Sequence, residues 1–380
     1  MDRPHPSTDV AVIGGGPIGL AIAWRAARRG LSVTLLERGA PGDGAAWRVA
    51  AGMLAPITEA SPAERSVLEL GLDSARRWPA FVQELTAAAG RDPGYARTGT
   101  LVVARDRDEA EALDRELAIR QELGLPVRRL LPSAARRREP ALAPGVRLAL
   151  DVPDDHAVDP RALTAALGAA ARAEGVAVRE EAEAIEVLAD GGAVAGVRLA
   201  GGAEVAAPQV VLAAGAWSAD LVPAPARVPL RPVKGQILRL RDPAGPGLLE
   251  RVVRLEGGYL VPRPDGTYVL GASVEERGFD TALTAGAVWE LIRDASEVVP
   301  GVLELELAEA AAGLRPATPD NAPVLGPGAL DGLVWATGHF RNGILLVPVT
   351  AELVAGGLAG EAWPAAFSPA RFAATPATAR

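Results

Sequence analysis

The chain has 380 residues, no cysteine, 49% hydrophobic residues and a formal net charge of −8 at pH 7. The missing thiol excludes disulfides, thiolate catalysis, iron–sulfur clusters, cysteine-ligated zinc and flavin attachment through a cysteine sulfur. The acidic balance disfavours nucleic acid and anionic membrane surfaces as partners, and the length favours two domains with a sizeable core.

Sequence motifs for other kinds of site are also absent. The three histidines are far apart in the sequence and form no HxxxH pair, so no metal site is expected. Neither a GxSxG nucleophile elbow nor a GxxxxGK[ST] phosphate loop occurs. The first apolar run begins within about ten residues of the N-terminus, which leaves no room for a signal peptide, and the apolar stretch 344–358 is too interrupted to span a bilayer. We therefore expect a cytoplasmic protein.

The first predicted elements form a strand–helix–strand unit near the N-terminus. An apolar run, 10–13, is followed by glycines at the spacing Gly14-x-Gly16-x-x-Gly19, then by a helical stretch and a second apolar run that ends at Glu37. This order and spacing match the dinucleotide-binding βαβ unit. A carboxylate at Glu37 can accept both hydroxyls of an adenosine ribose, which disfavours NADP. The motif by itself leaves FAD and NAD open.

Each residue of the glycine turn has a physical role. Gly14 permits a sharp turn out of the strand, Gly16 permits close approach of a pyrophosphate, and Gly19 permits helix–strand packing. Pro17 stands at the start of the helix, where a missing N–H costs nothing. The remaining N–H groups of the first turn, with the positive end of the helix dipole, would face the phosphates.

The chain then leaves and re-enters this first domain. Segment 45–55 is small and apolar, which suits either a buried turn or backbone laid along a flat cofactor. A helix is expected over 62–89, and a second domain begins with a strand over 100–104 and a helix over 108–123. Asp159-Pro160 predicts an N-capped helix to 175. Strands over 176–179, 184–188, 193–199 and 205–213 are expected to return to the first domain.

The second domain resumes near 231 with consecutive strands, which indicates an antiparallel sheet because no helices separate them. The expected strands cover 237–241, 252–255, 259–262, 267–272 and 305–314, with a hairpin turn at 264–266 and a helix over 283–297. A strand over 333–337 and a helix over 343–358 belong to the first domain again.

Several motifs together carry a resemblance to a known family. They read GGGPIG (14–19), AAGML (50–54), PVKGQ (232–236), GYLVPR (258–263), GLRP (313–316), PDNAP (319–323) and GHFRNGIL (338–345). The chain resembles the D-amino-acid oxidase superfamily of FAD enzymes, and within it the glycine oxidases of thiamine biosynthesis. The similarity runs through nearly the whole chain, and GHFRNGIL is its most specific part.

The resemblance implies an α/β fold in which two domains are interleaved. A Rossmann-like FAD-binding domain with a parallel βαβ sheet would comprise 1–93, 151–226 and 316–375. A substrate domain built on an antiparallel sheet with helices would comprise 94–150 and 227–315. Two positions depart from the family pattern: Trp47 stands where relatives carry small residues, and Gln236 where relatives often have Glu.

Non-covalent FAD is the cofactor that the resemblance implies, and the helix after residue 345 would point its positive end at the flavin N1–C2=O edge. The residues expected to contact FAD are Gly14, Gly16, Pro17, Ile18, Gly19, Glu37, Arg38, Ala46, Trp47, Ala51, Gly52, Met53, Ala184, Ala214, Gly215, Trp217, His339, Phe340, Arg341, Asn342, Gly343, Ile344 and Leu345. His339 is interpreted as a hydrogen-bonded turn residue.

For the substrate, the resemblance implies that Arg315 and Arg341 clamp a carboxylate and that Tyr259 also contacts it. Guanidinium suits this role because its planar fork meets a carboxylate with two hydrogen bonds. The implied reaction oxidises glycine, sarcosine or D-alanine by hydride transfer to the flavin, giving an imine that hydrolyses to ammonia and, from glycine, glyoxylate, while oxygen becomes hydrogen peroxide. A homotetramer is also implied.

Two alternatives stay open at this point. One is a D-amino acid dehydrogenase of the same fold that passes electrons to a quinone instead of oxygen. The other is a flavin-binding assembly subunit that has lost catalysis, which the presence of both arginines argues against.

Overall fold

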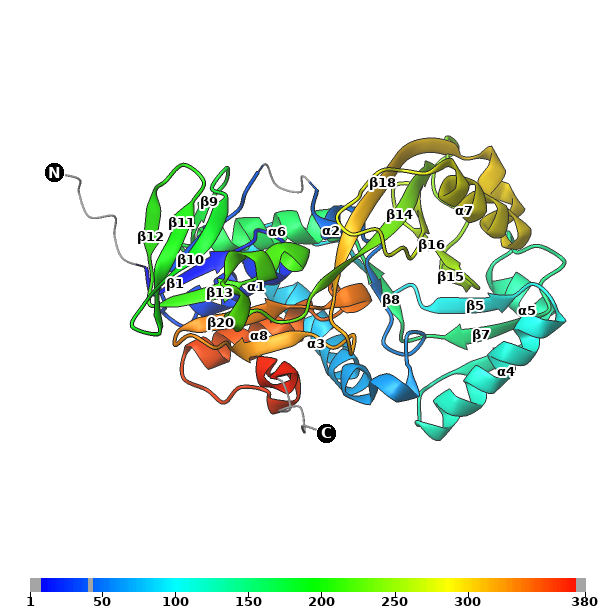
Figure 1. Ribbon diagram of the computed structural model, residues 1–380. Coiled ribbons are helices and arrows are strands. Elements are labelled where there is room, and N and C mark those ends of the chain that lie inside the picture. The colour runs from blue at the N-terminus through cyan, green and yellow to red at the C-terminus, as the bar shows by residue number, and fades with distance from the viewer. Residues whose placement is uncertain (1–7, 40–43, 374–380) are drawn as a thin grey trace.

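The computed structural model describes residues 8–39 and 44–373 and has two lobes joined by long strands (Figure 1). The first lobe is built on a six-stranded sheet. Its strands, in spatial order, are β19 (Val324–Pro327), β20 (Leu333–Thr337), β13 (Gln209–Leu212), β1 (Val10–Ile13), β2 (Val33–Leu36) and β9 (Ala177–Arg179). All neighbours pair in parallel except β19, which runs antiparallel to β20.

The central strand β1 shows why this sheet is covered on both faces. Its four residues are all buried, and alternate side chains point to opposite faces. Val10 and Val12 pack among the helices, while Ala11 and Ile13 pack against a separate small sheet. In a parallel sheet that is covered on both faces, the sequence of each strand is a continuous run of apolar residues, as it is in β1.

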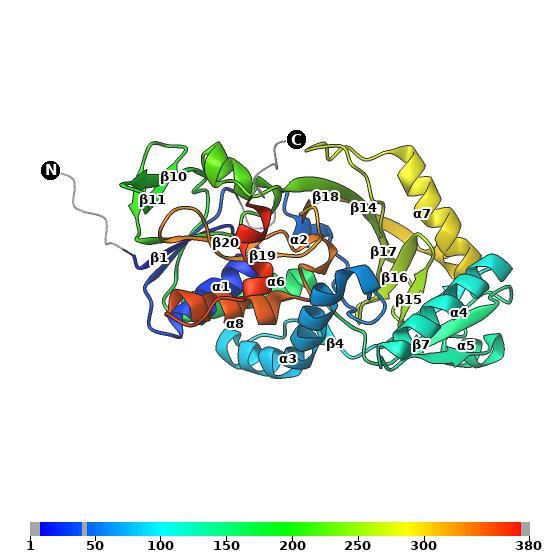
Figure 2. The ribbon, with the colours of Figure 1, turned by 60° about the horizontal axis from the view of Figure 1, so that its bottom comes forward.

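Four helices cover the first face of the sheet, and Figure 2 shows them gathered on one side of it. They are α1 (Pro17–Ala27), α3 (Arg65–Ala89), α6 (Pro160–Ala173) and α8 (Val347–Leu358). The predicted cap of α6 is confirmed, because the Asp159 carboxylate accepts hydrogen bonds from the N–H groups of Arg161 at 2.7 Å and Ala162 at 3.3 Å.

The opposite face is covered by a three-stranded antiparallel sheet, which consists of β10 (Ala184–Asp190), β11 (Ala193–Leu199) and β12 (Glu204–Ala206). We expected these strands to return to the first domain, and they pack against its sheet as a separate antiparallel sheet. The turn Gly191-Gly192 is too short for a crossover connection, so β10 and β11 can pair only as an antiparallel hairpin.

The second lobe is built on an eight-stranded sheet. In spatial order its strands are β18 (Glu306–Ala317), β14 (Arg231–Arg241), β17 (Thr267–Gly271), β16 (Gly258–Pro262), β15 (Val252–Leu255), β5 (Thr100–Ala104), β7 (Leu148–Val152) and β6 (Arg128–Leu130). Every pairing is antiparallel, as expected, except β5 with β15. The long strands β14 and β18 run between the lobes (Figure 1).

Three helices pack on this second sheet: α4 (Arg107–Glu122), α5 (Pro132–Arg138) and α7 (Ala285–Val298). α7 covers the β14–β17 end with Leu291 and Ala295, whereas α4 covers the β5–β7 end with Leu113 and Leu117. No helix among the described residues is long and apolar enough to cross a membrane.

A small sheet connects the lobes: β3 (Met53–Leu54), β8 (His156–Val158) and β4 (Tyr95–Ala96). It is preceded by a one-turn helix, α2 (Ala46–Val49). The predicted domain boundaries at 150 and 315 fall inside β7 and β18, and the predicted ends 1–7 and 374–375 lie outside the described residues. The helix expected from 343 begins at Val347, where Pro348 in the first turn loses no hydrogen bond.

Candidate active site

A cavity of about 710 Å³ lies between the two lobes. The first lobe contributes residues at and beyond the carboxyl ends of its parallel strands: Gly14 after β1, Glu37 after β2, Ala213 after β13, and Thr337 and His339 at the end of β20. Ligands of open α/β sheets bind at this edge. The second lobe closes the cavity with residues of β14, β16 and β18.

Most of the residues predicted to bind the cofactor or substrate line this one cavity. They are Gly14, Gly16, Pro17, Ile18, Glu37, Arg38, Ala46, Trp47, Ala51, Gly52, Met53, Ala184, Ala214, Gly215, Trp217, Tyr259, Arg315, His339, Phe340, Arg341, Gly343 and Ile344. Gly19, Asn342 and Leu345 do not line it.

These three residues instead make packing contacts or hydrogen bonds within the protein. A Cβ on Gly19 would overlap the carbonyl oxygen of Gly14, so Gly19 permits the close packing of α1 against the strand. Asn342 is buried within the turn, where its N–H donates to His339 O at 2.9 Å. The Leu345 carbonyl accepts hydrogen bonds from two side chains of α3, Ser74 at 2.6 Å and Trp78 at 2.9 Å.

The glycine turn forms a cradle that side chains would fill. Gly14 has a φ of 113°, and a Cβ there would overlap the backbone of Ala213. The N–H of Gly15 donates to Glu37 Oε2 at 2.6 Å, which fixes the carboxylate beside the turn. The indole of Trp47 packs against the turn, with Cδ1 3.5 Å from where a Cβ of Gly16 would lie. Trp47 therefore faces the cavity, a point that its residue type left open.

The segment after β20 forms a second group of donors. A 3₁₀ helix, η5 (Phe340–Asn342), is followed by a turn in which the N–H groups of Gly343 and Ile344 meet no acceptor within the described residues. Burial lowers the pKa of His339 to about 3, and its Nε2 lies 3.0 Å from Thr350 Oγ1. His339 is therefore a neutral, hydrogen-bonded residue at neutral pH.

Arg315 on β18 is a half-buried cation whose partners in the described chain are uncharged. Its Nη1 donates to the carbonyl oxygens of Ser273 at 3.1 Å and Lys234 at 3.3 Å, and none of the ion pairs among residues 8–39 and 44–373 involves it. Burial raises the pKa of the neighbouring Tyr259 hydroxyl above its ordinary value, against the opposing charge of Arg315. Tyr259 therefore remains a neutral donor beside an unpaired guanidinium, an arrangement that attracts a carboxylate.

Arg341 is held differently, by carboxylates that sequence reasoning missed. Its Nε lies 2.8 Å from Glu59 Oε2, and its Nη2 lies 2.8 Å from Glu64 Oε2. Arg254, which also lines the cavity, donates to Glu59 Oε1. Glu59 and Arg254 stand in no recognisable motif. The only signal for Glu59 is a carboxylate that closely follows an apolar run, 54–57.

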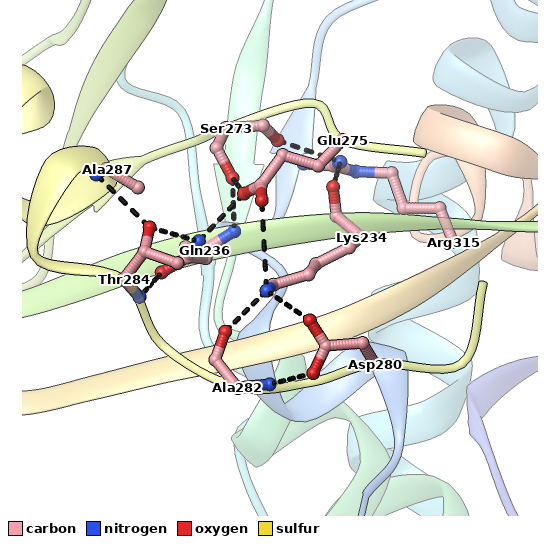
Figure 3. Close-up of polar contacts among 9 residues, drawn as sticks. All are labelled: Lys234, Gln236, Ser273, Glu275, Asp280, Ala282, Thr284, Ala287 and Arg315. Carbon is pink, nitrogen blue, oxygen red and sulfur yellow. Dashed lines mark hydrogen bonds and ion pairs between the residues drawn. The ribbon is translucent and has the colours of Figure 1, made fainter. Parts of the chain in front are cut away.

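A network around Lys234 positions the Arg315 guanidinium (Figure 3). The Lys234 ammonium is fully buried, lies 3.2 Å from Asp280 Oδ2 and donates to the Ala282 carbonyl. These contacts bind the segment 272–284 to β14. The same segment presents the Ser273 carbonyl, which accepts from Arg315. The single lysine of the chain thus organises the start of β14.

Gln236, one of the two residues that depart from the family pattern, belongs to the same network. Its side-chain amide donates to Glu275 Oε1 at 2.7 Å and to Thr284 Oγ1 at 3.1 Å, while its Oε1 accepts from Thr284 N–H at 2.9 Å. A neutral amide can donate and accept at once, which glutamate cannot do when ionised.

We expect Gly235→Ala to displace the Arg315 guanidinium, because the added Cβ would lie 2.6 Å from Arg315 Cζ. The expected result is a KM for amino acid substrate raised about tenfold or more, the effect of losing roughly 1.4 kcal/mol of binding. Flavin content should stay unchanged, since the change lies on β14. Steady-state kinetics with a flavin absorbance measurement checks both, and an unchanged KM would contradict the placement of Arg315.

A model of the family of FAD-dependent oxidoreductases matches residues 9–356. The chain belongs to this family. The prediction of FAD is confirmed, and the alternative of NAD that the glycine motif left open is excluded. The Gly14 cradle, the Glu37 carboxylate and the donors at Gly343 and Ile344 fit a dinucleotide that carries an electron-rich flavin edge.

Individual members of this family resemble the chain over nearly its full length. Glycine oxidase of Geobacillus kaustophilus is 36% identical over 353 residues, which are 91% of this chain and 92% of that protein. Its crystal structure superposes with a TM-score of 0.88 and covers 96% of this chain and 99% of the other. The bifunctional protein ThiO/ThiG of Trichormus variabilis is 37% identical across 91% of this chain, which spans 52% of that longer relative.

Proposed function

We propose that this FAD-dependent oxidoreductase oxidises glycine, and other small amino acids such as sarcosine and D-alanine, to an imine that hydrolyses to ammonia and, from glycine, glyoxylate. Oxygen is the proposed acceptor and hydrogen peroxide the second product, in the service of thiamine biosynthesis. The observation that carries the proposal is the unpaired guanidinium of Arg315 beside neutral Tyr259. The similarity to glycine oxidase supports the choice of substrate.

In this proposal the chain binds and orients the substrate. The carboxylate pairs with Arg315 and accepts a hydrogen bond from the Tyr259 hydroxyl, which holds the amino acid in one orientation. Bound FAD supplies an acceptor for the hydride that leaves Cα. The glycine turn and Glu37 would hold the dinucleotide end of FAD, and the N–H groups of Gly343 and Ile344 would be available to its flavin ring.

Neither His339 nor Glu59, two titratable groups that line the cavity, is free to act as a general base. His339 is neutral but already hydrogen-bonded to Thr350, and burial lowers its pKa to about 3. Glu59 is engaged by two guanidinium groups. We therefore propose that the substrate enters as the free amine or loses its ammonium proton to water, so that rates rise with pH toward the amine pKa.

The deciding experiment mixes purified holoenzyme with glycine without oxygen and records the visible spectrum. We expect the oxidised flavin band to bleach, and peroxide to form when air is admitted. Sarcosine, D-alanine and D-proline in the same assay would rank the substrates. If the band persists with all four amino acids, the proposal fails. If bleaching occurs but no peroxide forms in air, another acceptor replaces oxygen.

We further propose a cytoplasmic homotetramer, as the family resemblance implies. Light scattering coupled to size-exclusion chromatography would measure the mass of the assembly, and a mass other than four chains of 39.1 kDa would contradict this state.

A further inference from the structure

We propose that Glu59 determines how many carboxylates a substrate can carry. Its own carboxylate fills a second cationic site, formed by Arg254 and Arg341, and thereby restricts the enzyme to amino acids with one carboxylate. This inference rests on the proposed function, since it assumes that the cavity binds an amino acid at Arg315.

The first observation is that Glu59 bridges two arginines of the cavity. One carboxylate oxygen accepts from Arg254, and the other lies 2.8 Å from Arg341 Nε. All three side chains line the cavity. Glu64 completes the pairing on Arg341 from outside the cavity lining, at 2.8 Å, and Thr58 Oγ1 accepts from Arg254 at 3.1 Å. Two carboxylates thus balance two guanidinium groups.

The second observation is the contrast with Arg315. Carbonyl oxygens are the acceptors for Arg315, so its charge stays available to a ligand. Apart from Arg38, which lies over the Trp217 ring, the arginines of the cavity therefore form two cationic sites, one of which the protein already occupies. A carboxylate of Glu59 at Arg254 and Arg341 stands where a second substrate carboxylate would otherwise bind.

Both sites belong to the lining of one cavity. The charges of Arg315, Glu59 and Arg254 all affect the pKa of the Tyr259 hydroxyl, which burial raises most. Burial alone would raise the pKa of Glu59, but Arg254 and Arg341 outweigh it and hold that pKa below its ordinary value. Glu59 is therefore ionised at neutral pH and repels a nearby anion.

The third observation is that the backbone fixes Glu59 in place. The buried Asp155 carboxylate accepts from the N–H groups of Ile57 at 3.1 Å and Thr58 at 2.7 Å. The buried Arg120 guanidinium donates to the carbonyls of the same two residues, each at 3.0 Å. A segment held from both sides cannot readily withdraw its next residue, so the exclusion of a second anion is built into the resting protein.

The test compares two secondary amines that differ in one group. Sarcosine carries an N-methyl group where iminodiacetate carries an N-carboxymethyl group, which adds the second carboxylate. In Glu59→Gln holoenzyme, the ratio of kcat/KM for iminodiacetate to kcat/KM for sarcosine should rise at least about tenfold over wild type. The second carboxylate of iminodiacetate would then pair with the freed arginines instead of being repelled by Glu59. Glu64→Gln is the matched control: it also frees Arg341 but lies outside the cavity lining, so the ratio should change less than about threefold.

Adding Arg254→Met to Glu59→Gln should abolish the gain if Arg254 binds the second carboxylate. An unchanged ratio in Glu59→Gln, or a gain that survives Arg254→Met, would overturn the proposal. A gain that survives Arg254→Met would mean that Glu59→Gln enlarges the pocket without creating a binding site for the second carboxylate.

A binding measurement separates this inference from the proposed function, because it needs no turnover. Oxydiacetate and methoxyacetate are non-oxidisable ethers that differ in one carboxylate, and each can be titrated into oxidised holoenzyme while the flavin spectrum is recorded. Wild type should bind methoxyacetate more tightly, and Glu59→Gln should reverse the order. If Glu59→Gln does not retain FAD, the wild-type order alone decides: tighter binding of oxydiacetate would refute the proposal. Failure of glycine to bleach the flavin would instead refute the proposed function.

Discussion

Replacing Arg315 with alanine is expected to lower kcat/KM for glycine about a hundredfold or more, since loss of a buried charge pair costs roughly 2–5 kcal/mol. The flavin should remain bound, because Arg315 contacts the carbonyls of Lys234 and Ser273 and no residue of the glycine turn. Steady-state kinetics and the flavin absorbance of the purified variant check the two parts of this expectation.

The controls for Arg315 test position as well as charge. Arg315→Lys keeps the charge but loses the planar fork, so we expect an intermediate loss. Arg241→Ala, at the exposed end of β14, should leave kcat/KM unchanged. An Arg315→Ala enzyme with wild-type kcat/KM would refute the carboxylate site.

Arg341→Ala should cost less than Arg315→Ala. The family resemblance implies that both arginines clamp the substrate carboxylate, and on that basis Arg341→Ala would itself cost about 2–5 kcal/mol. The ion pairs of Arg341 with Glu59 and Glu64 change this expectation, because its charge is already balanced. A larger effect on kcat/KM from Arg341→Ala than from Arg315→Ala would contradict our division of roles.

Gly14→Ala is expected to yield protein that has lost its yellow colour. A φ of 113° strains any side chain, and the added Cβ would overlap the Ala213 backbone, which cannot rotate away. Strain of this kind costs about 1–3 kcal/mol before the overlap is counted, so FAD affinity should fall roughly a hundredfold or more. Flavin content after purification, followed by fluorescence titration with FAD, measures the loss.

Gly201→Ala is the matched control, because a Cβ at Gly201 meets nothing within 4 Å. That variant should bind FAD like wild type. Circular dichroism of Gly14→Ala distinguishes loss of the cofactor from loss of the fold. If Gly14→Ala binds FAD with the wild-type dissociation constant, the turn does not approach the dinucleotide as we propose.

Local sequence determined the elements whose signals lie within a few residues. The glycine spacing and the apolar runs around it identified β1, α1 and β2, and Asp159-Pro160 identified the start of α6. Most predicted cofactor residues line one cavity for the same reason, since their motifs directly follow strands whose carboxyl ends meet at one sheet edge. These patterns can be recognised in the sequence because local backbone geometry alone requires them.

Tertiary structure alone decided which charges meet. Glu59, Arg254 and Arg341 come from three distant segments, and nothing near any of them in sequence specifies the other two. The same holds for the pairing of β5 with β15. A guanidinium can bind a ligand carboxylate or a protein carboxylate by the same hydrogen bonds, so residue type cannot separate Arg315 from Arg341. Only the packing of the lobes places an acid beside one arginine and leaves carbonyls beside the other.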